Sequence, residues 1–444
     1  MKGVFVLIDG LGDLPCKQFE NKTPLEAAKT PNMDFLATRG EMGYMYPVKP
    51  GFIPESDEAI VSIFGNELLS SSRGQLEANG ADIKLTRGDL ALRANFATID
   101  SIKNREIVDR RVGRTLTTSE AEILAKAINK IKLPCDFVFK STIQHRGVLV
   151  LRGGFSDNVL GNDATYFQGK ISELNKVGIC KPLDEEENSQ YTVNVLNEFL
   201  EKVYGVLDSH PINKERRKKG LLPANCLLLR GAGIDPPNLK QFRKWMAIVY
   251  MPLEIGFARL SGMKVFSFDY PRLKELDAYK NLSEGLEKIC SNSIKCLKKN
   301  HKKFDYAYIH IKEVDLPGHD NKPFVKKEML EYIDKTLFSF LKKFAPQRKI
   351  HIVVTGDHST PCNIKKHSAD PVPVLFYNCS IPKVEKVVVQ NPGSQTFFSK
   401  IKERTFFNTE EKLKGKKFGE KQSRQGSLGR IIGNGLFTQV EFVK

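Results

Sequence analysis

The chain has 444 residues, of which 41% are hydrophobic, and it carries a formal net charge of +17. This length is too great for one ordinary core, so we expect two domains, and the apolar content is sufficient for a globular fold. No apolar run reaches about 18 residues, so we expect no membrane-spanning helix. The apolar start of MKGVFVLIDG reaches Asp9 after about five residues, too few for the apolar region of a signal peptide.

A strongly basic chain can bind nucleic acid, but these basic residues are scattered and lack interleaved aromatic side chains that would stack on bases. We therefore favour a solvated, lysine-rich surface that attracts anionic small-molecule substrates, with neither a nucleic-acid nor a membrane partner. Much of the excess charge lies in three stretches, 214–219, 298–303 and a predicted loop at 400–421. The cysteines stand singly without a CxxC pair, which is typical of reduced thiols in a cytoplasmic protein.

In chain order, the first 65 residues predict a strand, a loop and short helices. The apolar run at 4–8 is the strand, and a helix begins near Pro24. The stretch TPNMDFLATRG predicts a second helix with Thr30 as N-cap and Gly40 as C-cap. Ser56 follows, where a loop rich in glycine and proline enters an apolar helix.

The pattern of predicted elements changes near residue 85, from helices to short strands. The stretches GDLALRANFATID and NREIVDRR predict paired short strands, and a helix over 119–131 follows, capped by Thr118 or Ser119. Then FVFKSTIQ and RGVLVLRGG predict a hairpin. We interpret residues 81–185 as an inserted α+β domain that interrupts a core domain formed by residues 1–80 and 186–444.

The rest of the chain predicts an alternation of helices and strands, which favours an α/β core whose sheet is flanked by helices. The predicted helices cover 191–207, 282–299 and 325–344, and the predicted strands cover 224–230, 264–268, 306–311, 350–354 and 373–378.

Three of the predicted strands end in residue types that bind metals. The candidates are Asp9 after the strand at 4–8, Asp315 and His319 after 306–311, and Asp357 and His358 after 350–354. In open α/β sheets, ligands bind just beyond the carboxyl ends of the strands. Core packing does not explain three such strand ends, so the pattern predicts a metal centre and therefore an enzyme.

Each candidate has a simpler explanation when it is taken alone. Asp9 could be a helix cap, and His367, which precedes the strand at 373–378, could be a structural histidine. The Pro-Gly pair between Asp315 and His319 predicts a loop, although ligands in a loop can still converge. Ser56 could be an ordinary N-cap, although the backbone N–H groups of a helix start also favour an anionic nucleophile.

The candidate ligands are three aspartates, three histidines and one serine. Mixed Asp/His sets suit Mn²⁺ or Zn²⁺ better than Ca²⁺. Seven ligands suggest two metals, and two-metal sites, with ions about 3.5–4 Å apart, are typical of phosphoryl-transfer enzymes.

A series of motifs covers essentially the whole chain. They include DGLGD (9–13), KTPLEAAKTPNMDFLA (22–37), PESDEA (54–59), RANFATID (93–100), IVDRRVGR (107–114), HRGVLVLRG (145–153), LLRGAG (228–233), DLPGHD (315–320), TGDHSTPC (355–362) and HSADPVPVLF (367–376). In this order and spacing, they resemble the archaeal-type, cofactor-independent phosphoglycerate mutases of the alkaline phosphatase superfamily.

The resemblance implies an alkaline phosphatase-like core and a set of site residues. One metal would be held by Asp9, Ser56, Asp357 and His358, and the other by Asp315, His319 and His367. Ser56 would be the nucleophile that forms a phosphoserine, and Asp109 would be a general base. The substrate would be clamped by Arg110 and Arg114, with Arg73, Arg93 and Arg230 as weaker candidates.

The implied activity is the interconversion of 3-phosphoglycerate and 2-phosphoglycerate in glycolysis and gluconeogenesis, without 2,3-bisphosphoglycerate. The metals would most readily be Mn²⁺, with Zn²⁺, Co²⁺ or Mg²⁺ as alternatives. A phosphomonoesterase or another phosphotransferase, such as a phosphopentomutase, would use the same residues, and a basic nucleic-acid-binding protein is the alternative from another class. A homo-oligomer is compatible with the sequence. The chain departs from the family pattern at Glu58, Gln75 and the pair Asn321–Lys322.

Overall fold

The computed structural model describes residues 1–67, 73–163, 166–167, 170–171, 175–274, 276–379 and 416–443. These residues form two compact units. Unit 1 comprises Met1–Gly51, Ile63–Gly65 and Ser293–Lys444, and unit 2 comprises Phe52–Ser62 and Asn66–Asn292. The predicted insert, 81–185, lies inside unit 2. Most of the predicted lysine-rich loop, residues 400–415, lies outside the described residues.

Unit 1 is built around a mixed sheet with the strand order β14-β1-β15-β16-β2-β17. These strands are β1 (Gly3–Ile8), β2 (Glu41–Tyr46), β14 (Tyr306–Ile311), β15 (His351–Gly356), β16 (Val372–Tyr377) and β17 (Gly429–Ile432). Strand β1 is parallel to both of its neighbours, β14 and β15, and all of its residues are buried. A parallel strand covered on both faces needs apolar side chains at every position, which explains its uninterrupted apolar sequence. The three predicted ligand-bearing strands and the mixed α/β fold class are thus confirmed.

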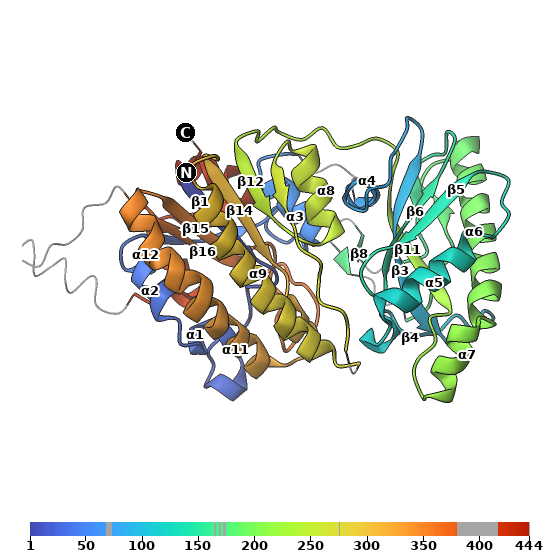
Figure 1. The fold of residues 1–444 in the computed structure, drawn as a ribbon, viewed down its shortest axis with the longest axis horizontal. Coiled ribbons are helices and arrows are strands. Elements are labelled where there is room, and N and C mark those ends of the chain that lie inside the picture. Colours follow the sequence, from blue (N-terminus) through green and yellow to red (C-terminus); the bar gives the residue numbers. More distant parts are fainter. Residues whose placement is uncertain are drawn as a thin grey trace, which may run out of the picture. The chain divides into compact units, whose positions relative to one another are not determined.

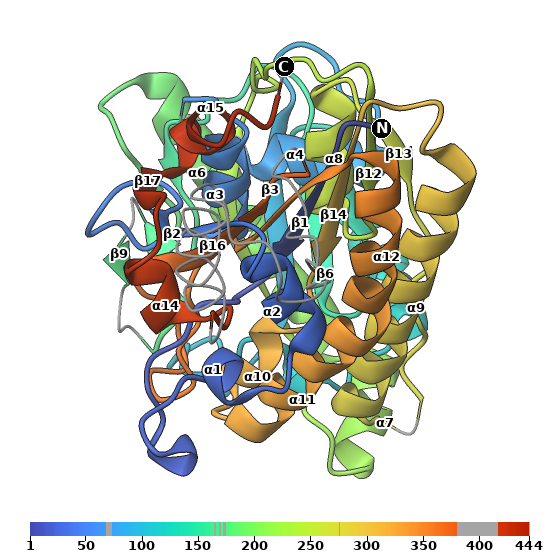
Figure 2. The ribbon, with the colours of Figure 1, turned by 90° about the vertical axis from the view of Figure 1, so that its left-hand side faces the viewer.

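Helices and the C-terminal strand complete unit 1. They are α1 (Pro24–Ala27), α2 (Pro31–Ala37), α10 (Asp315–His319), α11 (Pro323–Ile333), α12 (Ser339–Arg348), α14 (Glu420–Arg424) and α15 (Leu436–Gln439), with short turns η1 (Lys17–Phe19) and η4 (Gly433–Gly435). Figure 1 shows α11 and α12 beside the strands of the sheet. Figure 2 shows the C-terminal elements β17, α14 and α15 gathered next to β2 at the sheet edge.

The helix expected over 325–344 is present in unit 1. It runs over 323–348, where the π-helical turn η3 (Asp334–Phe338) joins α11 to α12 without a break. On this turn, Asp334 accepts a hydrogen bond of 2.7 Å from the backbone N–H of Met33, in the first turn of α2. Thr30 is the N-cap of α2, as predicted, although its side chain makes no capping bond; the predicted C-cap, Gly40, is wrong, because the C-cap is Thr38. A distant carboxylate therefore caps the helix, which local sequence cannot reveal.

Unit 2 contains an antiparallel sheet with the order β11-β3-β6-β5, and β4 pairs with the end of β3. The strands are β3 (Leu90–Ile99), β4 (Ile107–Asp109), β5 (Phe137–Ser141), β6 (Arg146–Leu151) and β11 (Cys226–Gly233). These pairings confirm the predicted paired strands and hairpin.

The two faces of this sheet have separate cores. Alternate residues of β3 pack with α5 (Thr118–Ile128) and α6 (Glu187–Asp208), while Ala91 packs toward α4 (Arg73–Gly80). The cap predicted for α5 is wrong by one or two residues. Thr117 is the N-cap, and it forms a reciprocal capping box with Glu120.

The remaining elements of unit 2 are short or peripheral to this sheet. They are α3 (Ser56–Ile63), η2 (Val112–Arg114), β7 (Val159–Leu160), β8 (Tyr166–Phe167), β9 (Lys170–Ile171), β10 (Lys181–Pro182), α7 (Pro211–Lys218), β12 (Trp245–Ile248), α8 (Pro252–Leu260), β13 (Lys264–Phe266) and α9 (Ala278–Asn300), whose last residues belong to unit 1.

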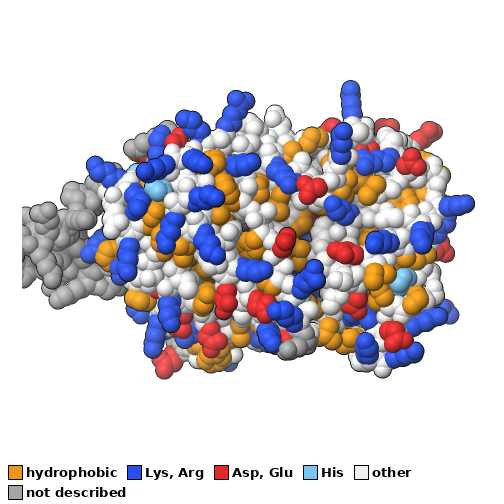
Figure 3. All heavy atoms as spheres, in the orientation of Figure 1, with side chains coloured by type: hydrophobic (Ala, Val, Ile, Leu, Met, Phe, Trp, Pro, Cys, Tyr) orange, Lys and Arg blue, Asp and Glu red, His pale blue; other side chains and the backbone are white. Residues whose placement is uncertain are grey.

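One face of the molecule shows how the basic residues are distributed. On the face shown in Figure 3, lysine and arginine side chains are spread among aspartates and glutamates and form no continuous stripe. This distribution agrees with the solvated basic surface expected from the sequence. Among the described residues, no helix combines the length and the apolar character needed to cross a membrane.

Candidate metal centre and associated residues

The register of three parallel strands brings the predicted carboxylates of unit 1 to one edge of the sheet. Ile8 at the end of β1 is aligned with Ile311 on β14 and with Gly356 on β15. Asp9 and Asp357 are the next residues of their strands, and the N–H of Gly10 donates to Asp357 Oδ1 at 3.1 Å. The metal-ligand types therefore converge beyond the carboxyl ends of the strands, as expected.

Gly10 is required by this geometry. Its φ of +62° lies in the left-handed region, and a Cβ at this position would lie 2.8 Å from Cα of Asp315. The DGLGD segment therefore turns tightly beside the carboxylates, and Gly10 is the residue that permits this turn.

The first potential metal group consists of Asp9, His310 and Asp357, whose ligand atoms all lie within 4.8 Å of one another. All three residues are buried. His358 lies against the same carboxylates, with Nε2 3.1 Å from Asp9 Oδ1 and 3.5 Å from Asp357 Oδ2. Sequence reasoning missed His310 because it stands inside an apolar strand, where a single histidine is typical of a core position.

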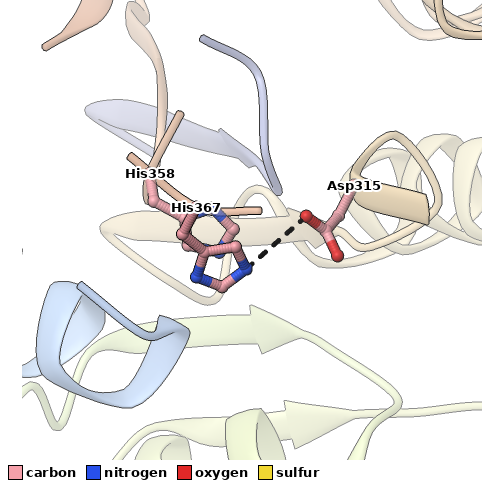
Figure 4. Close-up of side chains that lie close together, drawn as sticks. All are labelled: Asp315, His358 and His367. Atoms are coloured by element: carbon pink, nitrogen blue, oxygen red, sulfur yellow. Dashed lines mark ion pairs between the residues drawn. The ribbon is translucent and has the colours of Figure 1, made fainter. Parts of the chain in front are cut away.

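The second potential metal group consists of Asp315, His358 and His367, also within 4.8 Å (Figure 4). His367 Nε2 lies 3.8 Å from Asp315 Oδ1, and His319 Nε2 lies 3.3 Å from Asp315 Oδ2. The rings of His358 and His367 stack with centroids 3.7 Å apart. His358 is thus within reach of both groups.

The prediction of a loop between Asp315 and His319 is wrong, because residues Asp315–His319 form the one-turn helix α10. Pro317 is tolerated because it lies in the first turn, where a backbone N–H has no intrahelical partner to lose. The spacing of four residues then places the carboxylate and the imidazole on the same helical face.

Hydrogen bonds outside the ligands fix how the histidines present their rings. Thr360 Oγ1 donates to Asp315 Oδ1 at 2.7 Å and lies 3.0 Å from His358 Nδ1, so it accepts the N–H of that ring. His319 Nδ1 donates to the carbonyl of Lys365 at 3.0 Å. In both rings the proton is thereby assigned to Nδ1, and Nε2 is left to bind a metal.

We expect Thr360→Val to weaken metal binding by about 10–100-fold, because it removes the hydroxyl that orients Asp315 and His358 together. Calorimetric titration of the metal-stripped protein with Mn²⁺ would measure this loss. Thr355→Val is the matched control, since its buried hydroxyl donates to the carbonyl of Pro373 at 2.9 Å and so bonds within the sheet. Equal affinities in the two variants would contradict the orienting role of Thr360.

The protonation of the metal-free centre reflects its crowded carboxylates. Burial, and then the neighbouring charge of Asp9, raise the pKa of Asp357 to about 7. Burial alone would lower the pKa of His358, but the carboxylates of Asp357 and Asp9 raise it to about 9. The pKa of Asp9 stays below its ordinary value despite burial, because Lys312 and His358 lie beside it.

Metal affinity should therefore rise with pH. A metal must displace the proton of His358 below about pH 9 and also that of Asp357 below about pH 7. We expect the apparent affinity for Mn²⁺ to increase about tenfold per pH unit from pH 7 to pH 9, and more steeply below pH 7. Calorimetry in buffers of different ionisation enthalpy would count the released protons. An affinity that is constant from pH 7 to pH 9 would refute this coupling.

A buried lysine ties together the backbone segments that carry the ligands. The ammonium group of Lys326, on α11, donates to Asp13 Oδ2 at 2.7 Å and to the carbonyls of Gly12 and Thr360 at 3.3 and 3.1 Å. Asp13 in turn accepts a bond of 3.1 Å from the N–H of Cys362. Lys326 thus pairs with a carboxylate in the loop after β1 and also bonds to the backbone of the loop after β15, so it holds the two loops together. This role was not predicted from the sequence.

The residues of this centre suit a divalent cation. Among the described residues, no hydrogen bond reaches Asp357 Oδ2, which is fully buried, and the buried Asp9 Oδ1 faces Nε2 of His358 at 3.1 Å. Buried carboxylates without such partners are costly unless a cation compensates them. Together with imidazole nitrogens, these oxygens form the mixed donor set that Mn²⁺ or Zn²⁺ accepts.

Ser56, Asp109 and the predicted arginines belong to unit 2. Ser56 is the first residue of α3, as expected, and is 9% exposed. Glu58, a departure from the family pattern, accepts a bond of 2.9 Å from the N–H of Glu55 and so helps to cap this helix. Burial and the nearby Asp57 raise the pKa of Glu58 to about 8.

The other departures also have local roles. Gln75 donates to the carbonyl of Gly233 at 2.8 Å and so joins α4 to β11. Asn321 has a φ of 53°, a left-handed conformation that asparagine tolerates better than most residues. Neither departure alters a predicted metal ligand.

Four of the predicted arginines form ion pairs within unit 2. Arg73 pairs with Glu55 and Asp57, and Arg93 pairs with Glu77 at 2.9 Å. Arg230 pairs with Glu55 at 3.0 Å and with Asp163 at 3.4 Å. Arg110 also pairs with Asp163, at 2.6 Å. Arg73, Arg93 and Arg230 are largely buried, whereas one third of the Arg110 side chain is exposed. Arg110 is therefore the most accessible of the four for an added anion.

A second basic cluster surrounds His145, which sequence reasoning did not single out. This histidine is 4% exposed, and its pKa lies well below the ordinary value because of burial and the charges of Arg146, Arg111, Arg93 and Arg114. A neutral imidazole among four guanidinium groups is the kind of environment that attracts carboxylate or phosphate.

Asp109 lies at the turn that precedes this cluster. Its Oδ1 accepts bonds of 2.7 and 2.8 Å from the N–H groups of Arg111 and Gly113. The carboxylate thereby holds the turn that carries Arg111 and Arg114.

Comparison with known proteins gives a consistent picture. A family model described as 2,3-bisphosphoglycerate-independent phosphoglycerate mutase matches residues 37–213. A Thermococcus kodakarensis protein of the same description is 37% identical over 443 residues, which cover 98% of this chain and 95% of the relative.

Solved structures are similar along the full chain. A Pyrococcus horikoshii protein is 29% identical with a TM-score of 0.70, covering 100% of this chain and 98% of its own. A cofactor-independent phosphoglycerate mutase from Thermoplasma acidophilum is 29% identical with a TM-score of 0.52, covering 99% of this chain and 98% of its own.

Proposed function

Because this chain belongs to the family of 2,3-bisphosphoglycerate-independent phosphoglycerate mutases, we propose that it interconverts 3-phosphoglycerate and 2-phosphoglycerate through a phosphoserine. This reaction would serve glycolysis and gluconeogenesis in the cytoplasm. The observation that supports it most directly is the buried convergence of Asp and His side chains beyond β1, β14 and β15.

Two divalent cations, which we propose to be Mn²⁺, would complete the site. One would be held by Asp9, Ser56, Asp357 and His358, and the other by Asp315, His319 and His367. When bound, such cations lower the pKa of a coordinated hydroxyl and neutralise phosphoryl oxygens. Zn²⁺, Co²⁺ and Mg²⁺ are alternatives with the same ligands.

In the first transfer, Ser56 Oγ gives up its proton and attacks the phosphorus of 3-phosphoglycerate. The Oγ–P bond forms, the bond from phosphorus to the 3-oxygen breaks, and that oxygen takes up the equivalent of the proton that Ser56 released. Glycerate stays bound and reorients. In the second transfer, Asp109 removes the proton of the 2-hydroxyl, which attacks phosphorus while the Oγ–P bond breaks. The proton held by Asp109 is then returned to Ser56 Oγ, so that both residues are restored.

Arginines of unit 2 would hold the substrate. We propose that residues 81–185 form a substrate-clamping domain and that residues 1–80 and 186–444 form the metal-binding core. Arg110 and Arg114 are the main candidates for binding the substrate carboxylate or phosphate, since guanidinium groups bind both bidentately. Arg73, Arg93 and Arg230 are weaker candidates, because a substrate would compete with their buried carboxylate partners.

A phosphomonoesterase of the same superfamily is the second candidate function. It would use the same residues but would admit water to the phosphoserine. The ratio of isomer to free phosphate distinguishes the two enzymes, because only hydrolysis releases phosphate.

The test is a coupled assay with metal-stripped protein, 3-phosphoglycerate and added Mn²⁺, without 2,3-bisphosphoglycerate. We expect metal-dependent formation of 2-phosphoglycerate with little free phosphate. Phosphate release without isomer would instead establish the phosphatase. If neither 2-phosphoglycerate nor free phosphate formed with any of the four metals, the proposed function would be refuted.

A further inference from the structure

We propose that His310 is a ligand of the metal held by Asp9 and Asp357, in addition to the ligands that the family resemblance implies. This inference rests on the proposed metal centre and assigns one more residue of the chain to it.

Strand register places His310 beside the carboxylates. On β14, His310 is aligned with Leu7 of β1, two residues before Asp9, and Leu7 is aligned with Thr355 of β15, two residues before Asp357. Side chains two residues apart on a strand point to the same face. His310 therefore lies on the sheet face toward which Asp9 follows β1, the strand next to β14, and Asp357 follows β15, the strand beyond β1, and it is 1% exposed.

The distance between His310 and Asp357 suits two ligands of one ion. Nε2 of His310 lies 3.7 Å from Oδ2 of Asp357, which is too long for a hydrogen bond. Two ligand atoms that are each about 2.0–2.2 Å from a shared metal lie roughly 3–4 Å apart. The same oxygen of Asp357 lies 3.5 Å from Nε2 of His358, so both imidazoles stand at this spacing from it.

A hydrogen bond on the far side of the ring orients His310 toward the carboxylates. Its Nδ1 lies 2.8 Å from the hydroxyl of Tyr308, which is buried and stacks on Phe5 with ring centroids 5.8 Å apart. A tyrosine hydroxyl can accept the N–H of Nδ1, which leaves the lone pair of Nε2 for a metal. Such an outer partner is the usual companion of a ligating histidine.

The local charge also favours a cation at this position. Asp9, His310 and Asp357 each offer a ligand atom within 4.8 Å of the others, and Oδ2 of Asp9 also pairs with Lys312. Among the described residues, Oδ2 of Asp357 accepts no hydrogen bond although it is buried. A dication bound there by Asp9, Asp357 and a neutral His310 would compensate both carboxylates.

The test counts imidazole ligands on the full-length protein loaded with Co²⁺. In proton NMR, each histidine bound through Nε2 contributes one exchangeable Nδ1–H signal that is strongly shifted by the paramagnetic ion. We expect four such signals in the wild type and three in His310→Gln. In calorimetry with Mn²⁺, His310→Gln should weaken one of the two binding events by at least about tenfold.

His351→Gln is the matched control. His351 is the first residue of β15, at the opposite end of that strand from Asp357, so its replacement should leave both readouts unchanged. Three shifted signals in the wild type would show that His310 is not a ligand, while the metal centre itself would stand. This measurement needs only the wild-type protein, so it tests the inference even if His310→Gln does not fold. Binding of no metal by the wild type would refute the proposed centre itself.

Discussion

Replacing Ser56 by alanine is expected to lower the rate of phosphoglycerate interconversion by at least about 10⁴-fold, the scale seen when a catalytic nucleophile is removed. Without Oγ, no phosphoserine can form, and no other group of the proposed mechanism can carry the phosphoryl between the two oxygens. The coupled assay at saturating Mn²⁺ measures the rate. Intact-mass analysis after brief mixing with substrate would detect the phosphorylated wild type and no such species in the variant.

Ser62→Ala provides the matched control, since Ser62 lies in the same helix, α3, and is 4% exposed. It should retain nearly the full rate. Retention of a tenth of the rate in Ser56→Ala would assign the nucleophile to another residue. If the variant bound Mn²⁺ normally but lost activity, Ser56 would be essential for the chemistry and dispensable for metal affinity.

Lys326→Met should produce the largest loss of stability. The wild-type ammonium group is fully buried against Asp13 at 2.7 Å, so removal of the lysine leaves an uncompensated buried carboxylate. Breaking one partner of such a pair costs about 3–5 kcal/mol. Urea unfolding of the metal-free protein measures this change. We also expect weaker metal binding, since Lys326 joins the loops after β1 and β15.

Lys327→Met is the matched control on the same helix. Lys327 pairs with Glu331 at 2.8 Å, but both side chains are about one quarter exposed, so its loss should cost about 1 kcal/mol or less. A double variant, Lys326→Met with Asp13→Asn, should regain part of the stability, because it removes the buried charge along with its partner. If Lys326→Met and Lys327→Met lost similar amounts of stability, burial of the ion pair would not explain the effect of Lys326.

The elements that were predicted correctly are those whose cause is local. The apolar run before Asp9 identifies a buried strand from its composition alone, and the position of Ser56 at a helix start follows from the loop and the apolar segment on either side. The helix ends were less reliable: the N-cap of α5 is Thr117, before the predicted Thr118 or Ser119, and α10 forms where Pro317 and Gly318 suggested a loop.

The sequence by itself determined the fold class and the candidate ligands Asp9, Asp315 and Asp357, because each follows an apolar strand that is recognisable from its composition. Only the tertiary structure decided that His310 belongs with them and that Lys326 joins their loops. A histidine within an apolar strand and a lysine on a helix carry no local mark of such a role. Their partners are set by the parallel register of β14, β1 and β15 and by the packing of α11, which bring together residues about 50 to more than 300 positions apart in the chain.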